Sequence, residues 1–114
     1  MSGGVRVFKL TDMVGGWFVG NFTPAALRTD AAEVGVKRYR AGDTEAAHEH
    51  RIATELTLIL SGDVEMNGRR LMSGDIVTLE AGEPAEFRAF ADTITVVVKL
   101  PSVPGDKHVI EPAR

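Results

Sequence analysis

Residues 42–62 read GDTEAAHEHRIATELTLILSG, with two histidines and a glutamate spaced between two glycines as G-x5-H-x-H-x4-E-x6-G. Residues two apart on an extended strand point to the same side, so His48 and His50 present both imidazoles to one side. A turn after His50 can return the chain antiparallel and place Glu55 opposite them. The stretch therefore predicts two strands whose three polar side chains face one interior.

Two neutral imidazoles and one carboxylate form a nitrogen-and-oxygen ligand set that suits a divalent transition metal and leaves coordination positions open. The chain has no cysteine, which excludes thiolate ligands, disulfides and cysteine nucleophiles. We therefore predict that His48, His50 and Glu55 bind one ion of iron, manganese, nickel or zinc. The alternative is that the same residues form a hydrogen-bonded polar cluster in a small-molecule pocket.

Outside this stretch, short apolar runs alternate with turn signals at a spacing of about ten residues, which is typical of an all-β sandwich or barrel. Only residues 24–33 have local helix propensity. The clearest hairpin turn is Asn67-Gly68, because both residues tolerate the positive φ that a two-residue turn requires. The candidate strands along the whole chain are Val5 to Lys9, Trp17 to Asn21, Val34 to Arg40, Glu55 to Ser61, Val64 to Met66, Asp75 to Leu79, Ala85 to Phe90 and Thr93 to Leu100.

The length of 114 residues predicts one domain. The net charge is −3 and the basic residues are scattered, so we expect no nucleic-acid partner. Lys37, Arg38 and Arg40 are expected as solvated strand positions. No apolar run is long enough to span a bilayer and no signal peptide is recognisable at the start, so we expect no membrane association and a cytoplasmic location.

A second pattern, GDIVTLEAGEPA, occupies residues 74–85. Together with the first pattern it resembles the two motifs of the cupin superfamily, of the small cupin 2 conserved-barrel type. It departs from the family at Glu80, where a proline is usual, and at Ala85, where a fourth ligand histidine is usual. The resemblance implies an all-β fold, the double-stranded β-helix or jelly-roll cupin barrel. Three ligands bind a metal less tightly than four, so Ala85 bears directly on metal binding.

The resemblance implies one cupin domain over residues 1–114. We expect the barrel core at about residues 34–100, N-terminal strands in residues 1–33, and an extended tail at residues 101–114 that wraps either its own barrel or a partner subunit. The strand Glu55 to Ser61 has two apolar faces, and such a strand needs a second layer. We therefore expect sheet-on-sheet packing outside the barrel, in a homodimer.

The predicted function is that of a metal-binding cupin protein acting on an unidentified small organic molecule. Oxygenase, isomerase, lyase and hydrolase chemistry all occur on such barrels, so the reaction class and the catalytic residues stay open. A non-catalytic small-molecule binding or sensor module is the alternative from a different class. A structural or storage barrel is the third hypothesis. It fits poorly with three inward-facing polar side chains, His48, His50 and Glu55, which we call the triad.

Several further residues have two possible roles. Glu86 is expected as an outward solvated residue, and the alternative is that a small bulge turns it inward. His108 is expected as a surface histidine, and the alternative is that it closes the site from a neighbouring subunit. The aromatic residues are expected as core fillers, although one at the barrel mouth could stack on a ligand ring. They are Trp17, Phe18, Phe22, Phe87 and Phe90.

Overall fold

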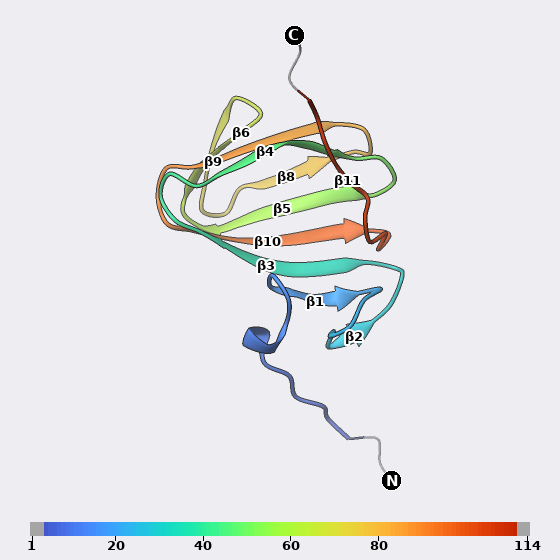
Figure 1. The fold of residues 1–114 in the computed structure, drawn as a ribbon. Coiled ribbons are helices and arrows are strands. Elements are labelled where there is room, and N and C mark those ends of the chain that lie inside the picture. The colour runs from blue at the N-terminus through green and yellow to red at the C-terminus, as the bar shows by residue number, and fades with distance from the viewer. Residues whose placement is uncertain (1–3, 112–114) are drawn as a thin grey trace.

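The computed structural model describes residues 4–111, whose regular secondary structure is almost entirely β-strand (Figure 1). No helix in this part of the chain is long and apolar enough to cross a membrane. The elements in chain order are the 3-10 helix η1 (Leu10–Asp12) and the strands β1 (Trp17–Gly20), β2 (Leu27–Arg28), β3 (Glu33–Tyr39), β4 (Thr44–His50), β5 (Thr54–Ser61), β6 (Asp63–Met66), β7 (Arg69–Met72), β8 (Ile76–Leu79), β9 (Pro84–Ala89), β10 (Thr93–Leu100) and β11 (Lys107–Val109).

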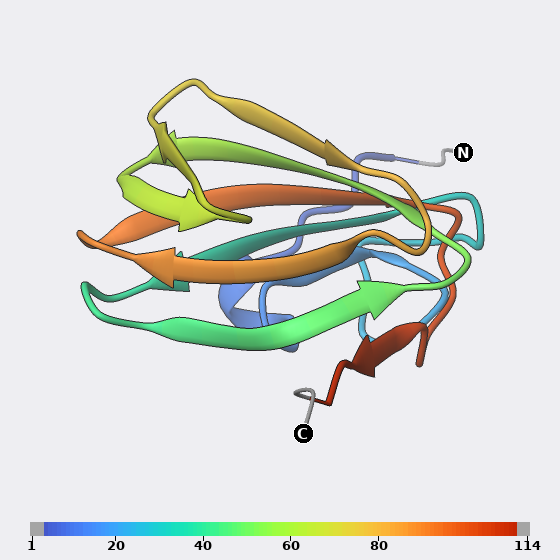
Figure 2. The same cartoon turned by 90° about the horizontal axis from the view of Figure 1, so that it is seen from above.

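The strands form two sheets that face each other (Figure 2). The six-stranded sheet has the order β2-β1-β3-β10-β5-β8, and the five-stranded sheet has the order β11-β4-β9-β6-β7. Apart from the short parallel pair of β1 and β2, neighbouring strands are antiparallel. Consecutive strands such as β4 and β5 lie in different sheets, as a double-stranded β-helix requires. The predicted all-β fold class is confirmed.

The alternation along β5 determines which side chains enter the space between the sheets. Glu55, Thr57 and Ile59 are buried, whereas Leu56 and Leu58 lie on the outer face and are only partly buried. The outer face of this strand is therefore apolar, while its inner face changes from polar to apolar along its length. This polarity change separates a polar half of the interior from an apolar half.

The apolar half of the interior is packed around Ile59 and Val64, neither of which is exposed to solvent. Of the aromatic residues expected to fill the core, Phe87 belongs to this cluster, whereas Phe90 is 37% exposed and lies beneath the guanidinium of Arg70. The buried members of the cluster are Ile59, Val64, Met66, Leu79, Ala85, Phe87 and Ala89.

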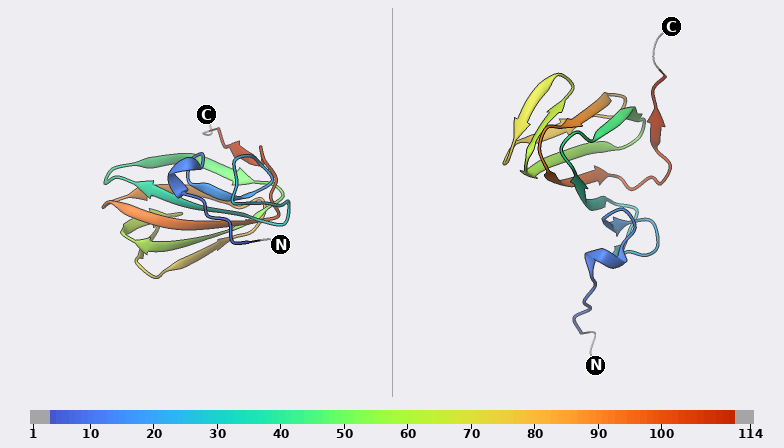
Figure 3. Two further views of the ribbon diagram at one scale, coloured as in Figure 1. Left: turned by 90° about the horizontal axis from the view of Figure 1, so that it is seen from below. Right: turned by 60° about the vertical axis from the view of Figure 1, so that its left-hand side comes forward.

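Two elements near the N-terminus differ from the sequence predictions. Residues 5–9 form no strand and extend away from both sheets, because the alternating apolar residues there have no partner strand to pair with (Figures 1 and 3). The segment 24–33, which has local helix propensity, contains no helix. It contributes β2 instead, since the backbone amide of Ala26 hydrogen-bonds the carbonyl of Phe18 and that of Thr29 bonds Gly20. Tertiary pairing with β1 thus overrides local helix propensity.

The structure tests the predicted hairpin turn and shows which barrel the C-terminal tail covers. Asn67 and Gly68 have φ values of 51° and 78°, so the predicted turn is confirmed, and it joins β6 to β7, a strand that the sequence analysis omitted. The described part of the tail, residues 101–111, wraps its own barrel, because β11 pairs antiparallel with β4 along its edge. That pairing covers the edge of the strand that carries both site histidines.

Candidate functional site

The three predicted ligands lie on both sides of one turn. His48 and His50 lie at the end of β4, and Glu55 is the second residue of β5, after the turn at residues 51–53. All three are buried, with 4%, 5% and 8% of their surfaces exposed. The two imidazole rings meet edge to face, with their centres 5.4 Å apart. The spacing in the sequence therefore places these three side chains in one interior, as expected.

The ring of His48 is oriented by the backbone. Its Nδ1 lies 3.0 Å from the carbonyl oxygen of Ala46. A carbonyl oxygen can only accept, so Nδ1 carries the proton and donates it. In the neutral ring, Nε2 is then left with its lone pair free. This is the arrangement by which proteins orient a metal-binding imidazole.

The ring of His50 has no comparable partner. Neither Nδ1 nor Nε2 forms a hydrogen bond with any described residue, although both atoms are buried. The nearest charged group is Glu55, whose Oε1 lies 3.6 Å from Nε2. Buried polar atoms without a partner cost free energy. The ring is therefore suited to bind a metal ion or a hydrogen-bonding ligand through its nitrogens.

Glu55 is held in its charged form by its neighbours. Burial raises the pKa of its carboxyl group, but His50 beside it, with Lys99 and His48, outweighs burial and lowers that pKa below its usual value. Lys99 stands directly opposite Glu55 in the β10–β5 register. Burial lowers the pKa of the Lys99 ammonium, and Glu55 only partly offsets this effect. Glu55 is therefore a carboxylate at neutral pH.

The three side chains fit a divalent metal in the kind of donor they offer, and the partnerless nitrogens of His50 are consistent with a ligand role. Within residues 4–111, however, no three His, Cys, Asp or Glu side chains have their donor atoms gathered closely enough to hold one ion. Binding would therefore require these side chains to move closer together. The backbone brings the donors to one place without completing a coordination sphere.

Of the remaining candidate residues, Ala85 faces the site, whereas Glu86 and His108 lie on the outer side. Ala85 is buried opposite His48 in the β4–β9 register, so the position of the usual fourth ligand does face the site. Glu86 is exposed on the outer side of β9 and is not turned inward. His108 pairs opposite Glu49 on the outer side of β4, and its Nε2 lies 3.8 Å from a carboxylate oxygen of Asp106.

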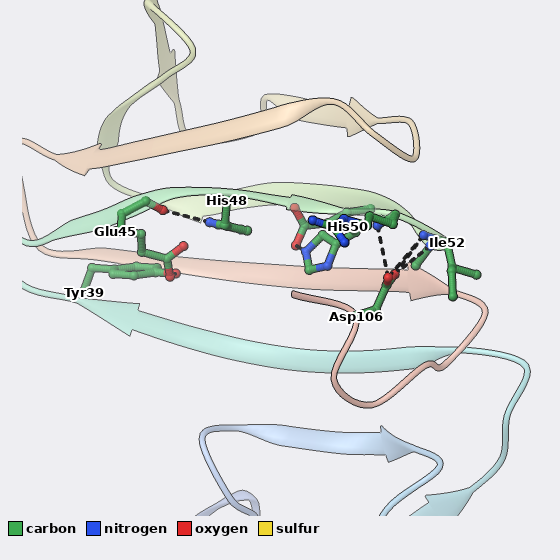
Figure 4. Close-up of polar contacts among 10 residues, drawn as sticks. Tyr39, Glu45, His48, His50, Ile52 and Asp106 are labelled. Atoms are coloured by element: carbon green, nitrogen blue, oxygen red, sulfur yellow. Dashed lines mark hydrogen bonds and ion pairs between the residues drawn. The ribbon is translucent and has the colours of Figure 1, made fainter. Parts of the chain in front are cut away.

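A cavity of about 110 Å³ lies beside these residues and is bordered by His48 and Glu55. Tyr39 on its wall donates a hydrogen bond from its hydroxyl to Glu45 at 2.7 Å (Figure 4). Burial, followed by the effect of the Glu45 carboxylate, raises the pKa of the Tyr39 phenol above its usual value. Tyr39 therefore keeps its proton at neutral pH.

The turn between the histidines and Glu55 is held by a residue from the tail. The carboxylate of Asp106 accepts hydrogen bonds from the backbone amides of Arg51, Ile52 and Ala53 at 2.9–3.2 Å (Figure 4). Asp106 is only 6% exposed. Through these bonds, the tail fixes the turn between the strand that carries the two histidines and the strand that carries Glu55.

Sequence reasoning missed several residues that border the cavity. Lys37 was expected to be solvated, but it is half-buried at the cavity wall, whereas Arg38 and Arg40 are exposed as expected. The signal was present, because Lys37 shares the strand face of Tyr39, two residues away. Trp17 borders the cavity instead of filling the core, with the ammonium of Lys99 4.7 Å from its ring centre.

No family model matches the sequence, and no curated protein matches it. Solved structures do match. An uncharacterized conserved protein with a double-stranded beta-helix domain from Klebsiella pneumoniae is 24% identical, with a TM-score of 0.70 over 94% of this chain and 93% of that protein. The DMSP lyase DddQ from Ruegeria pomeroyi is 26% identical, with a TM-score of 0.65 over 76% of this chain and 47% of the lyase.

A cupin-2 domain-containing protein from Shewanella frigidimarina is 12% identical, with a TM-score of 0.53 over 64% of this chain and 74% of that protein. The similarity to the Klebsiella protein extends over nearly the full length of both chains, so it includes both sheets and not a single hairpin. The chain therefore has the double-stranded β-helix fold.

Proposed function

We propose that this chain is a metal-binding cupin protein that acts on a small organic molecule in the cavity between its sheets. The observation that carries the proposal is the buried pair of His48 and His50 beside the Glu55 carboxylate, with both nitrogens of His50 lacking partners in the described structure. The similarity to a structure named as a lyase supports small-molecule chemistry on this fold. The reaction class stays open.

In this proposal His48, His50 and Glu55 would hold the ion, which would supply a Lewis acid with open positions for substrate or water. The carbonyl of Ala46 accepts a hydrogen bond from Nδ1 of His48, which leaves the lone pair of Nε2 free for the ion. Glu55 contributes a negative charge. Tyr39 keeps the proton on its hydroxyl oxygen and donates a hydrogen bond to Glu45, which fixes a polar group at the cavity wall.

A second candidate is a binding module that holds a small molecule without a metal. It is favoured by one observation: the donor atoms of the triad do not converge in the described structure. In that case His48 and Glu55, which border the cavity, would hydrogen-bond the ligand directly. The two candidates share the cavity and differ in metal content.

Elemental analysis of protein purified without an affinity tag or chelator separates them. We expect close to one iron, manganese, nickel or zinc ion per chain in the wild type, and loss of that ion in His48→Ala, because removal of one of three ligands leaves a weak site. His108→Ala is the matched control, since it removes the one remaining histidine outside the site and should retain the metal. A wild-type protein without metal, even after incubation with these four salts, would favour the binding module.

The proposed assembly is a homodimer that pairs the outer faces of the six-stranded sheet. An apolar row crosses four strands of that face in register, through Val36, Val96, Leu58 and Ile76. Ile76 is 64% exposed in the single chain. Sedimentation analysis should give twice the 12.3 kDa chain mass, and a mass of one chain at micromolar concentration would contradict the dimer.

A further inference from the structure

Three of the four lysines in the chain border the cavity next to the triad. Lys37 comes from β3, Lys99 from β10 and Lys107 from β11, so both sheets contribute. Lys99 lies opposite Glu55 in register, and Lys107 lies opposite His50. The strand pairing thus directs cationic side chains that are distant in sequence to one small space.

These ammonium groups have no carboxylate partner. No lysine takes part in the ion pairs formed by residues 4–111, although two carboxylates border the same cavity. Glu45 accepts the hydrogen bond from Tyr39, and Glu55 lies against His50. Since none of the three ammonium groups forms an ion pair with a described carboxylate, they remain available for an anion that enters the cavity.

The indole ring of Trp17 holds two of the cations at one wall. The ammonium of Lys99 lies 4.7 Å from the ring centre, and that of Lys37 lies 5.7 Å from it. Both distances fall within the range of a cation–π attraction. Trp17 and both lysines border the same cavity, so the two charges can act on a single anionic group that enters it.

We infer that the cavity binds the carboxylate of a small organic acid, with the ammonium groups of Lys37 and Lys99 as its charge partners. Phe87 and Val97 give the cavity apolar wall for a carbon skeleton, which distinguishes it from a site for inorganic anions. The volume of about 110 Å³ limits the ligand to a small molecule. This inference names the substrate class for the proposed function and rests on it only for the location of the ligand.

Trp17 is the single tryptophan of the chain, so its fluorescence reports directly on this cavity. The experiment titrates metal-free protein with butyrate and benzoate, with their neutral amides butyramide and benzamide, and with inorganic phosphate. Calorimetry provides a second readout that does not depend on the indole. We expect the carboxylates to bind at least about 10-fold more tightly than the amides and than phosphate, with an affinity that falls as salt is added.

The variant that tests the charge partner is Lys99→Met, which keeps the length of the side chain and removes its charge. We expect it to weaken carboxylate binding by about 10-fold, and Lys99→Arg to restore most of the loss. Lys37→Met should show the same direction. The matched control is Lys9→Met, because Lys9 is the one lysine outside this cavity and should leave binding unchanged.

The outcomes separate this inference from the proposed function. Equal binding of acids and amides, equal binding of phosphate, or unchanged carboxylate affinity in both methionine variants would overturn the inference, whatever the metal content. A wild-type protein that binds no metal but prefers carboxylates in a Lys99-dependent manner would overturn the metal proposal alone. Measurement in His48→Ala extends the comparison to a protein that cannot retain the ion.

Discussion

Replacement of His50 with alanine is expected to lower the affinity for a divalent metal by about 100-fold or more while the barrel stays folded. The loss follows because two ligands, His48 and Glu55, would remain. The fold should survive, since His50 forms no hydrogen bond within the described residues and its removal breaks none. The remaining cost is that of a small cavity, about 1–2 kcal/mol. Chelator competition measures the affinity, and urea unfolding of metal-free protein measures the stability.

The matched control for this variant is Glu49→Ala. Glu49 lies on the same strand between the two histidines and points to the opposite side, where it pairs with Arg51. It should keep wild-type metal affinity. Two outcomes would contradict the prediction. Unchanged metal affinity in His50→Ala would exclude His50 as a ligand, and unfolding of the metal-free variant would give the ring a structural role.

Replacement of Asp106 with alanine is expected to destabilise the protein by about 3 kcal/mol at neutral pH. Its buried carboxylate accepts backbone hydrogen bonds from three successive residues, and Ala53, whose amide donates one of them, is itself only 2% exposed. Removal of the acceptor leaves these amides without a partner and frees the tail from the turn. Equilibrium denaturation of wild type and variant measures the difference.

The same contact predicts a pH dependence. Burial raises the pKa of the Asp106 carboxyl group, but the amide donors at Ala53, Ile52 and Arg51 outweigh burial and lower it below the ordinary value of about 3.9. A lowered folded-state pKa adds stability above the unfolded value, and that stability is lost as the pH falls through the folded value. The difference between wild type and Asp106→Ala should therefore be full near neutral pH and shrink below about pH 4.

The control for this prediction is Asp43→Ala. The Asp43 carboxylate is exposed and accepts one backbone amide hydrogen bond, from Arg40 at 2.7 Å. Its loss should cost about 1 kcal/mol or less. Equal losses in the two variants, or a difference between wild type and Asp106→Ala that stays constant on acidification, would show that the tail carboxylate does not stabilise the turn by its charge.

Local patterns were sufficient to predict the polar centre of this molecule. Two histidines separated by one residue must share a face of an extended strand, and a short turn returns Glu55 to them. Both statements depend only on the two-residue period of a strand and on the length of the turn. The same period predicts the strand Thr93 to Leu100, whose bounds agree with β10. Motif spacing then pointed to the barrel fold.

Local patterns failed where a partner strand decides the outcome. Residues 5–9 alternate like a strand but have nothing to pair with, and residues 24–33 favour a helix but pair with β1. Ala85 was recognised as the position of a missing ligand. Only the β4–β9 register shows that it faces His48.

By itself, the sequence determined the all-β class and the residues that form the triad, because these follow from neighbours along the chain. Only the tertiary structure decided that Lys37 and Lys99 border the cavity and that Asp106 holds the turn at residues 51–53. These contacts join segments more than fifty residues apart. Their geometry depends on strand order and register, which are set by packing of the whole barrel and not by any local pattern.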